Sequence, residues 1–95
     1  MSKTIWKYEL QVTDRQILEI PEDHLVLHLA MQQGKPCLWV MVDTERRKVP
    51  VPYLLFGTGH PLPKNIEETS AFMGSFQMKS ISNGDLVFHV FEVQA

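Results

Sequence analysis

Residues 57–63 read Gly-Thr-Gly-His-Pro-Leu-Pro and combine the groups in this sequence that are best suited to hold a small ligand. Gly57 and Gly59 allow a ligand to approach the backbone closely, Thr58 supplies a hydroxyl, and His60 supplies a ring that can donate or accept a hydrogen bond. The segment lacks the Gly-Lys-Ser/Thr of a phosphate-binding loop. We therefore expect either a ligand-binding loop or a rigid turn in which His60 satisfies a backbone carbonyl.

A second candidate group is the run of cations Arg46, Arg47 and Lys48, which a proline-rich stretch separates from Tyr53. Cations beside aromatic rings can hold an anionic ligand that carries a base, such as a nucleotide. A solvated hairpin tip would account for the same three cations. The first interpretation predicts that these four residues and residues 57–60 form one ligand site.

No residue pattern predicts catalysis or metal binding. Cys37 lies in an apolar run beside Trp39, which is typical of a buried thiol and not of a nucleophile. No serine occurs in a Gly-x-Ser-x-Gly context. His24 and His28 would lie about 13 Å apart along a strand, which is too far for them to share an ion. We expect no catalytic residue, no metal ligand and no cofactor.

Length and composition favour one small domain. The chain has 95 residues, of which 44% are apolar and 21% charged, enough to build a single core. A net charge of -2 argues against a protein that coats duplex nucleic acid. The apolar runs are too short for a membrane helix, and a lone cysteine without a signal-peptide pattern favours the cytoplasm. We expect one β-rich domain over residues 1–95.

Apolar and polar residues alternate with a period of two in several segments, which is typical of half-buried strands. β-branched residues are abundant and alanine is rare, which favours strands over helices. Short strands that are separated by turns predict a compact antiparallel sandwich or a partly open barrel. The seven predicted strands are residues 4–10, 16–20, 24–32, 37–43, 53–56, 71–78 and 86–93.

Two connections have the composition of hairpin turns. Residues 33–36 contain glycine and predict a hairpin between the third and fourth strands. Asn83 and Gly84 predict another between the last two strands, because both residues tolerate positive φ. Strict alternation then predicts that Leu25, Leu27, Leu29 and Met31 share one face. In residues 71–78, it places Phe72 on the same face as Gly74, Phe76 and Met78.

Prolines determine the expectations for the middle of the chain. Residues 49–52 alternate valine with proline, which predicts an extended edge or a polyproline segment. Residues 64–70 predict one helical turn, with Pro63 suited to the first helical position.

Four segments, spread over nearly the whole chain, stand out together. They read Ile-Trp-Lys-Tyr at 5–8, Gly-Lys-Pro-Cys-Leu-Trp at 34–39, Gly-Thr-Gly-His-Pro-Leu-Pro at 57–63 and Val-Phe-His-Val-Phe-Glu at 87–92. This combination resembles a family of small uncharacterised proteins of phages and prophages, most specifically in its last two segments. The resemblance implies a stand-alone accessory protein in the cytoplasm of an infected bacterium, and it assigns no active site.

Accessory phage proteins without enzymatic motifs commonly act by occupying a component of the host. We therefore expect a counter-defence protein that sequesters a host nucleotide signal by stoichiometric binding, through residues 57–63 and their basic and aromatic neighbours. Exposed edge strands favour a homo-oligomer. One alternative is an inhibitor that presents an edge strand or residues 46–48 to a host enzyme. Another is a small hydrolase or metal enzyme.

Overall fold

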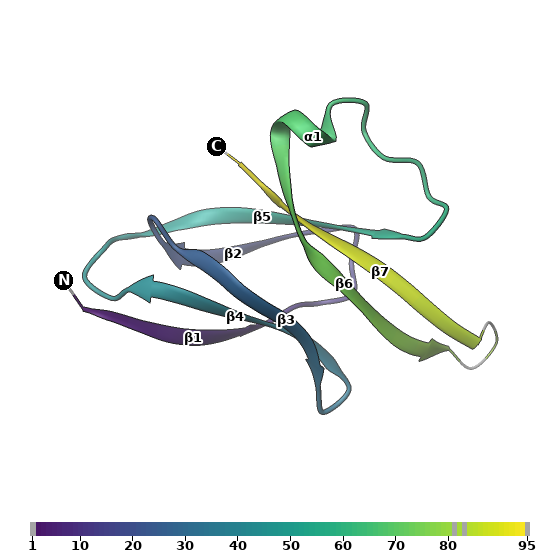
Figure 1. Cartoon of the computed structure of the whole chain (residues 1–95), viewed down its shortest axis with the longest axis horizontal. Helices are drawn as coiled ribbons and strands as arrows, with labels where there is room; N and C mark the ends of the chain where they lie inside the picture. The colour runs from purple at the N-terminus through teal and green to yellow at the C-terminus, as the bar shows by residue number, and fades with distance from the viewer. Residues whose placement is uncertain (1, 81, 83, 95) are drawn as a thin grey trace.

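The computed structural model describes residues 2–80, 82 and 84–94, which form two antiparallel sheets and one helical turn (Figure 1). One sheet has the order β1-β4-β3 and the other the order β2-β5-β7-β6. The predicted antiparallel architecture with one helical turn is confirmed. The strands are β1 (Lys3–Glu9), β2 (Arg15–Pro21), β3 (Leu25–Gln32), β4 (Lys35–Asp43), β5 (Lys48–Gly57), β6 (Ser70–Ser80) and β7 (Gly84–Val93), and α1 (Ile66–Thr69) lies between β5 and β6.

The core lies between the two sheets and is built from alternate residues of the strands. In β5, for example, Val51, Tyr53 and Leu55 are buried, and the residues between them face outward. Each aliphatic side chain that is fully withdrawn from water stabilises the fold by about 1.5–3 kcal/mol. The buried core residues are Leu10, Ile20, Leu38, Val40, Val42, Val51, Tyr53, Leu55, Phe76 and Val90.

The predicted hairpin between β3 and β4 is confirmed, with a tighter turn than residues 33–36 suggested. Gln33 and Gly34 have φ values of 52° and 79°, so both central residues of a two-residue turn are left-handed. Pairing therefore begins at once, with Gln32 opposite Lys35, and the following proline belongs to β4.

A bulge in β3 places its leucines on different faces of the sheet, whereas strict alternation predicted that they share one face. The register against β4 shifts between Val26 and His28. The extra residue reverses the alternation, so Leu25 stays exposed while Leu29 packs against the core. The prediction of one continuous apolar face over this strand is therefore wrong.

β5 runs without a break through Pro50 and Pro52, where the sequence predicted an edge or polyproline segment. Leu55 N donates to Asp14 O at 3.1 Å, so the odd-numbered residues of β5 direct their backbone groups toward β2 and both prolines face the opposite side. On that side, β7 pairs only with the second half of β5, from Tyr53 onward. The prolines thus lie where the ladder needs no N–H donor.

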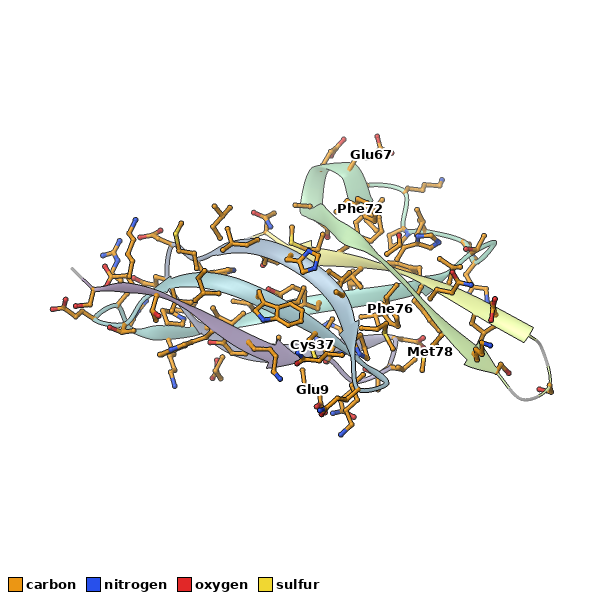
Figure 2. The ribbon with its side chains drawn as sticks, turned by 60° about the horizontal axis from the view of Figure 1, so that its bottom comes forward. Glu9, Cys37, Glu67, Phe72, Phe76 and Met78 are labelled. Carbon is orange, nitrogen blue, oxygen red and sulfur yellow. The ribbon has the colours of Figure 1, made fainter. Side chains whose placement is uncertain are left out.

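The C-terminal hairpin pairs β6 with β7 from Ser70 opposite Val93 to Ser80 opposite Gly84, which confirms the predicted strand pair. Asn83, on which the predicted turn depends, lies outside the described residues. A register shift between Phe72 and Gly74 puts Phe72 on the outer face, whereas Phe76 is buried; Figure 2 shows Phe72 beside α1 and Phe76 further along β6. The prediction that these phenylalanines share one face is wrong.

The helical turn is confirmed, but it begins later than Pro63. α1 starts at Ile66, whose side chain is buried and whose N–H donates to Pro63 O at 3.2 Å. Burial of Ile66 fixes the turn against the sheet. In the part of the chain that the structure describes, no helix has both the length and the apolar character needed to cross a membrane.

We predict that Gly74→Ala destabilises the protein more than Gly34→Ala. Both glycines have positive φ, but Gly74 lies at 138° and a Cβ there would come within 3.2 Å of Leu29 Cδ2, whereas a Cβ at Gly34 meets no atom within 4 Å. Backbone strain costs about 1 kcal/mol in either variant, and the contact with Leu29 adds about 1–3 kcal/mol at Gly74. Urea denaturation measures the difference, and equal losses would refute the close packing of β6 on β3.

Candidate functional site

The loop that follows β5 borders an open pocket on the outer face of the four-stranded sheet. The pocket has a volume of about 230 Å³. Residues 57–60 and Leu62 line it from the loop, and Phe56, Phe72, His89 and Phe91 line it from the strands. The structure thus brings together Gly57, Thr58, Gly59 and His60, the four loop residues that the sequence singled out.

Three phenylalanines from three neighbouring strands form one wall of this pocket. The ring centroids of Phe56 and Phe91 are 5.9 Å apart in an edge-to-face arrangement, and those of Phe72 and Phe91 are 5.4 Å apart. Both separations suit favourable aromatic pairs. Phe72 is nevertheless 57% exposed, so a large part of its ring remains available for contact.

The imidazole of His89 connects the loop to the sheet. Its Nε2 lies 2.8 Å from Thr58 Oγ1 and its Nδ1 lies 2.7 Å from Ser75 Oγ. Hydroxyl groups both donate and accept, so either tautomer of His89 satisfies both contacts. The backbone adds a further link, because Thr58 N donates to Val87 O at 3.2 Å. The start of the loop is therefore held in place against β7.

His60 folds back over the end of β5. Its N–H donates to Gly57 O at 3.1 Å, and its ring lies so close to Gly57 that a Cβ at that position would come within 3.3 Å of His60 Cε1. Glycine at position 57 thus makes room for the ring at the pocket wall. Within the described residues, the nitrogens of the His60 ring form no hydrogen bond, so this turn leaves the ring's hydrogen-bonding capacity for a ligand.

The predicted basic residues lie in a different environment. Arg46 forms an ion pair with Asp23, and Arg47 Nε lies 2.7 Å from Glu22 Oε1. Lys48 Nζ lies over the ring of Trp6, 5.6 Å from its centroid. Each of the three cations thus has a partner within the chain.

β5 itself separates these cations from the loop. Lys48 and Gly57 are its two ends. At a rise of about 3.3 Å per residue, they are about 30 Å apart. The structure therefore does not form the single site of loop and cations that the sequence suggested.

Tyr53, which was expected to face a ligand, is a core residue with no exposed surface. It lies on the inner face because it alternates with the outward-facing Pro52 and Leu54. Its hydroxyl donates to Glu92 Oε2 at 2.5 Å. Tyr53 therefore belongs to a buried polar network instead of the ligand pocket.

This network satisfies the carboxylate of Glu92, which is only 9% exposed. Glu92 Oε2 also lies 2.9 Å from His24 Nε2, and Glu92 Oε1 accepts from Gln94 Nε2 at 3.1 Å. His24 Nδ1 lies 3.1 Å from Pro21 O. A carbonyl only accepts, so Nδ1 is the donor in this contact. Three side chains, those of Tyr53, His24 and Gln94, thus surround the Glu92 carboxylate.

Sequence reasoning missed this network, although one signal was present. Glu92 occupies the same face of β7 as the buried Val90, and a charged residue at such a position requires a polar partner. A cleft of about 530 Å³ between the proline-containing half of β5 and the end of β7 leads toward the pair of His24 and Glu92. Both ring nitrogens of His24 are engaged, which leaves neither to act as a base toward a molecule in this cleft.

The described residues include no group of three histidine, cysteine, aspartate or glutamate side chains arranged to hold a metal ion. Cys37 is buried, as the sequence predicted. At the loop pocket, the geometry offers aromatic contact from the exposed ring of Phe72 and a hydrogen-bonding ring from His60.

We predict that Glu92→Ala lowers the free energy of unfolding by about 3–5 kcal/mol, because it leaves the Tyr53 hydroxyl and His24 without their buried acceptor. Tyr53→Phe should cost less, about 1–3 kcal/mol, since Glu92 keeps its other donors. Glu67→Ala on the exposed surface of α1 is the control and should change stability by less than about 0.5 kcal/mol. Urea denaturation compares the three, and equal effects at positions 92 and 67 would disprove the role of the network.

We also predict that the protein loses stability at alkaline pH through Tyr53. Burial, together with the hydrogen bond to Glu92, raises the pKa of Tyr53 far above its ordinary value of 10.0. Above about pH 10 the unfolded chain loses this proton and the folded protein keeps it, so stability falls by up to about 1.4 kcal/mol per pH unit. Denaturation at a series of alkaline pH values should show a shallower decline for Tyr53→Phe. Parallel declines in the two proteins would contradict the prediction.

Comparison with known proteins places the whole chain in one family. A family model described as a domain of unknown function (DUF7352) matches residues 1–95. The comparisons with curated proteins and with solved structures find no match. Because the match extends from end to end, both sheets, the loop pocket and the Glu92 network fall within the family's domain. The chain therefore belongs to the family of the domain of unknown function DUF7352.

Proposed function

We propose that this protein binds a small molecule stoichiometrically in the loop pocket and that the bound part is a planar aromatic ring, such as the base of a nucleotide. The observation that carries the proposal is the exposed ring of Phe72 beside a pocket lined by two further phenylalanines and His60. Stacking of a base on an aromatic side chain contributes about 1–3 kcal/mol. His60 can add a directional hydrogen bond at the ring edge.

The size of the pocket and the charge of its lining limit the class of ligand that it can bind. Its volume of about 230 Å³ is less than the about 300–1,000 Å³ of typical small-molecule sites, so it accommodates one ring system and not a whole nucleotide. The residues that line it in the described chain include no lysine or arginine. The base would therefore provide most of the affinity, and any phosphate would extend into solvent.

The biological role we propose is counter-defence in the cytoplasm of a phage-infected bacterium, by sequestration of a host nucleotide signal. The two segments in which the resemblance to phage and prophage proteins is most specific, residues 57–63 and 87–92, meet at this pocket through the contact of Thr58 with His89. A binding role requires no turnover. It relies on the exposed ring of Phe72 and on His60, both of which line the pocket.

A hydrolase is the alternative that one contact favours, since the 2.7 Å separation between Ser75 Oγ and His89 Nδ1 is that of a nucleophile and a base. The group on the other side of His89 is the hydroxyl of Thr58 and not a carboxylate. This arrangement lacks the charged partner that stabilises an imidazolium in a catalytic triad. Binding without conversion is therefore the better-supported activity.

The test is a panel of nucleosides and cyclic nucleotides added to the purified protein. A ligand at a hundredfold excess over Kd stabilises the folded state by about 2.7 kcal/mol, which raises Tm by several degrees. Phe72→Ala and His60→Ala should keep the fold and weaken binding, the former by about tenfold or more. Arg46→Ala, at the distant end of β5, is the control and should bind normally.

Three results would contradict the proposal. The first is that no member of the panel raises Tm. The second is that Phe72→Ala binds as well as the unchanged protein, and the third is that chromatography shows conversion of the recovered compound. A selective loss of binding in Arg46→Ala would instead move the ligand site to the turn between β4 and β5.

A further inference from the structure

The free edge of β1 presents backbone groups that the described chain does not cover. Leu10 N donates to Pro36 O at 2.8 Å, so the even-numbered residues at this end of the chain direct their backbone groups toward β4. The odd-numbered residues Lys3, Ile5 and Lys7, with Glu9, direct theirs away from the sheet. β1 runs along one border of the molecule in Figure 1. An open edge of this kind is a template for pairing with another strand.

The other sheet edges are protected in the described structure. β3 and β6 pack against each other at Leu29 and Gly74, and each carries a bulge. On the free edge of β2, Thr13 Oγ1 donates to Arg15 O at 3.3 Å, and Pro21 at the other end has no N–H. Bulges, prolines and covered carbonyls all oppose strand addition. Among the described edges, β1 has no bulge, no proline and no covered carbonyl, and the charges of Lys3 and Lys7 are its remaining protection.

We propose that β1 pairs antiparallel with β1 of a second copy, centred on Trp6, so that two three-stranded sheets join into one six-stranded sheet. The odd-numbered residues of β1 direct their backbone groups toward the free edge, so in an antiparallel pair they must lie opposite odd-numbered residues of the second copy. This condition allows only registers in which one residue of β1 lies opposite the same residue of the second copy. The register centred on Trp6 is the one that pairs the whole strand from Lys3 to Glu9.

Charge favours this register over its neighbours. It places Lys3 opposite Glu9 of the partner subunit, and the two-fold symmetry repeats that contact at the other end. A register centred on Ile5 would instead place Lys3 opposite Lys7 of the partner subunit. Opposite charges across a strand pair are stabilising and like charges are destabilising. Glu9 is available for this contact, because its only described ion pair is an exposed one, 3.6 Å from Lys35 Nζ. In Figure 2, Glu9 lies below Cys37 at the lower side of the molecule.

Side chains on both faces of the joined sheet support the same pairing. On the outer face, Ile5 is 55% exposed, and its apolar surface would lie against the aliphatic stem of Lys7 of the partner subunit. On the inner face, Trp6 would lie opposite the partner's Trp6 in a non-hydrogen-bonded pair, where side chains approach most closely.

The test compares Ile5→Lys with Ile5→Glu by analytical ultracentrifugation over a range of concentrations. Both variants lose the same apolar surface, but position 5 lies opposite Lys7 of the partner subunit in both halves of the dimer. We expect the unchanged protein to dimerise and the dissociation constant of Ile5→Lys to exceed that of Ile5→Glu by about tenfold. Ile17→Lys on β2 is the matched control, since Ile17 is 50% exposed, and it should dimerise like the unchanged protein.

Circular dichroism of each variant confirms that only folded chains are compared. The proposal is overturned if the unchanged protein remains monomeric at all concentrations or if the two variants at position 5 dissociate alike. It is also overturned if Ile17→Lys is the variant that separates the subunits, because the pairing edge would then be β2. None of these outcomes depends on a ligand in the loop pocket.

Discussion

The register between β5 and β7 is the constraint on which both the buried network around Glu92 and the loop pocket depend. Tyr53 is opposite Glu92, and Phe56 is opposite His89. The first pair lies on the inner face and anchors the buried network, and the second lies on the outer face and forms the floor of the loop pocket. Because side chains alternate with a period of two, a slip of one residue would move each pair to the wrong face. Core and pocket are thus specified together.

The histidines illustrate how the fold restricts chemistry. His24 and His89 both have their two ring nitrogens occupied by neighbouring groups. A ring held in this way stabilises local structure, because it ties together the groups on either side of it. His60 differs, since its backbone is tied into a turn while its ring borders the pocket. The loop therefore brings to the pocket an imidazole whose ring nitrogens form no hydrogen bond within the described residues.

The prolines of β5 have a second consequence besides ending the pairing with β7. Where β7 leaves β5, it continues beside β6, and Gln94 N donates to Thr69 O at 2.8 Å. The resulting gap forms the cleft that leads to His24 and Glu92. Access to water from this cleft explains how a carboxylate is tolerated on the inner face of the sandwich, because partial hydration lowers the free-energy cost of burying charge. Two prolines thus shape both the ladder and the environment of the acid.

Period-two alternation, turn composition and the glycine- and proline-rich loop were sufficient to predict the presence of seven strands, the pairing of β3 with β4 and of β6 with β7, and the four loop residues that border one pocket. These features depend on short stretches of backbone, whose preferences are local. The first half of β5 was not predicted as part of a continuous strand, because its two prolines favoured an edge or polyproline segment. The bulges at Val26 and at Phe72 could not be predicted in the same way, because each arises from the fit between two strands and not from either strand alone. The faces of Leu25 and Phe72 were therefore assigned incorrectly.

The sequence by itself determined an antiparallel β fold and marked residues 57–60 as a candidate site. Only the tertiary structure decided which distant residues meet. It buried Tyr53 against Glu92, paired the cations at 46 and 47 with the acids at 22 and 23, and kept Lys48 a full strand length from the loop. The physical reason is that alternation along a strand shows which residues share a face, whereas strand order and register determine what lies across from them.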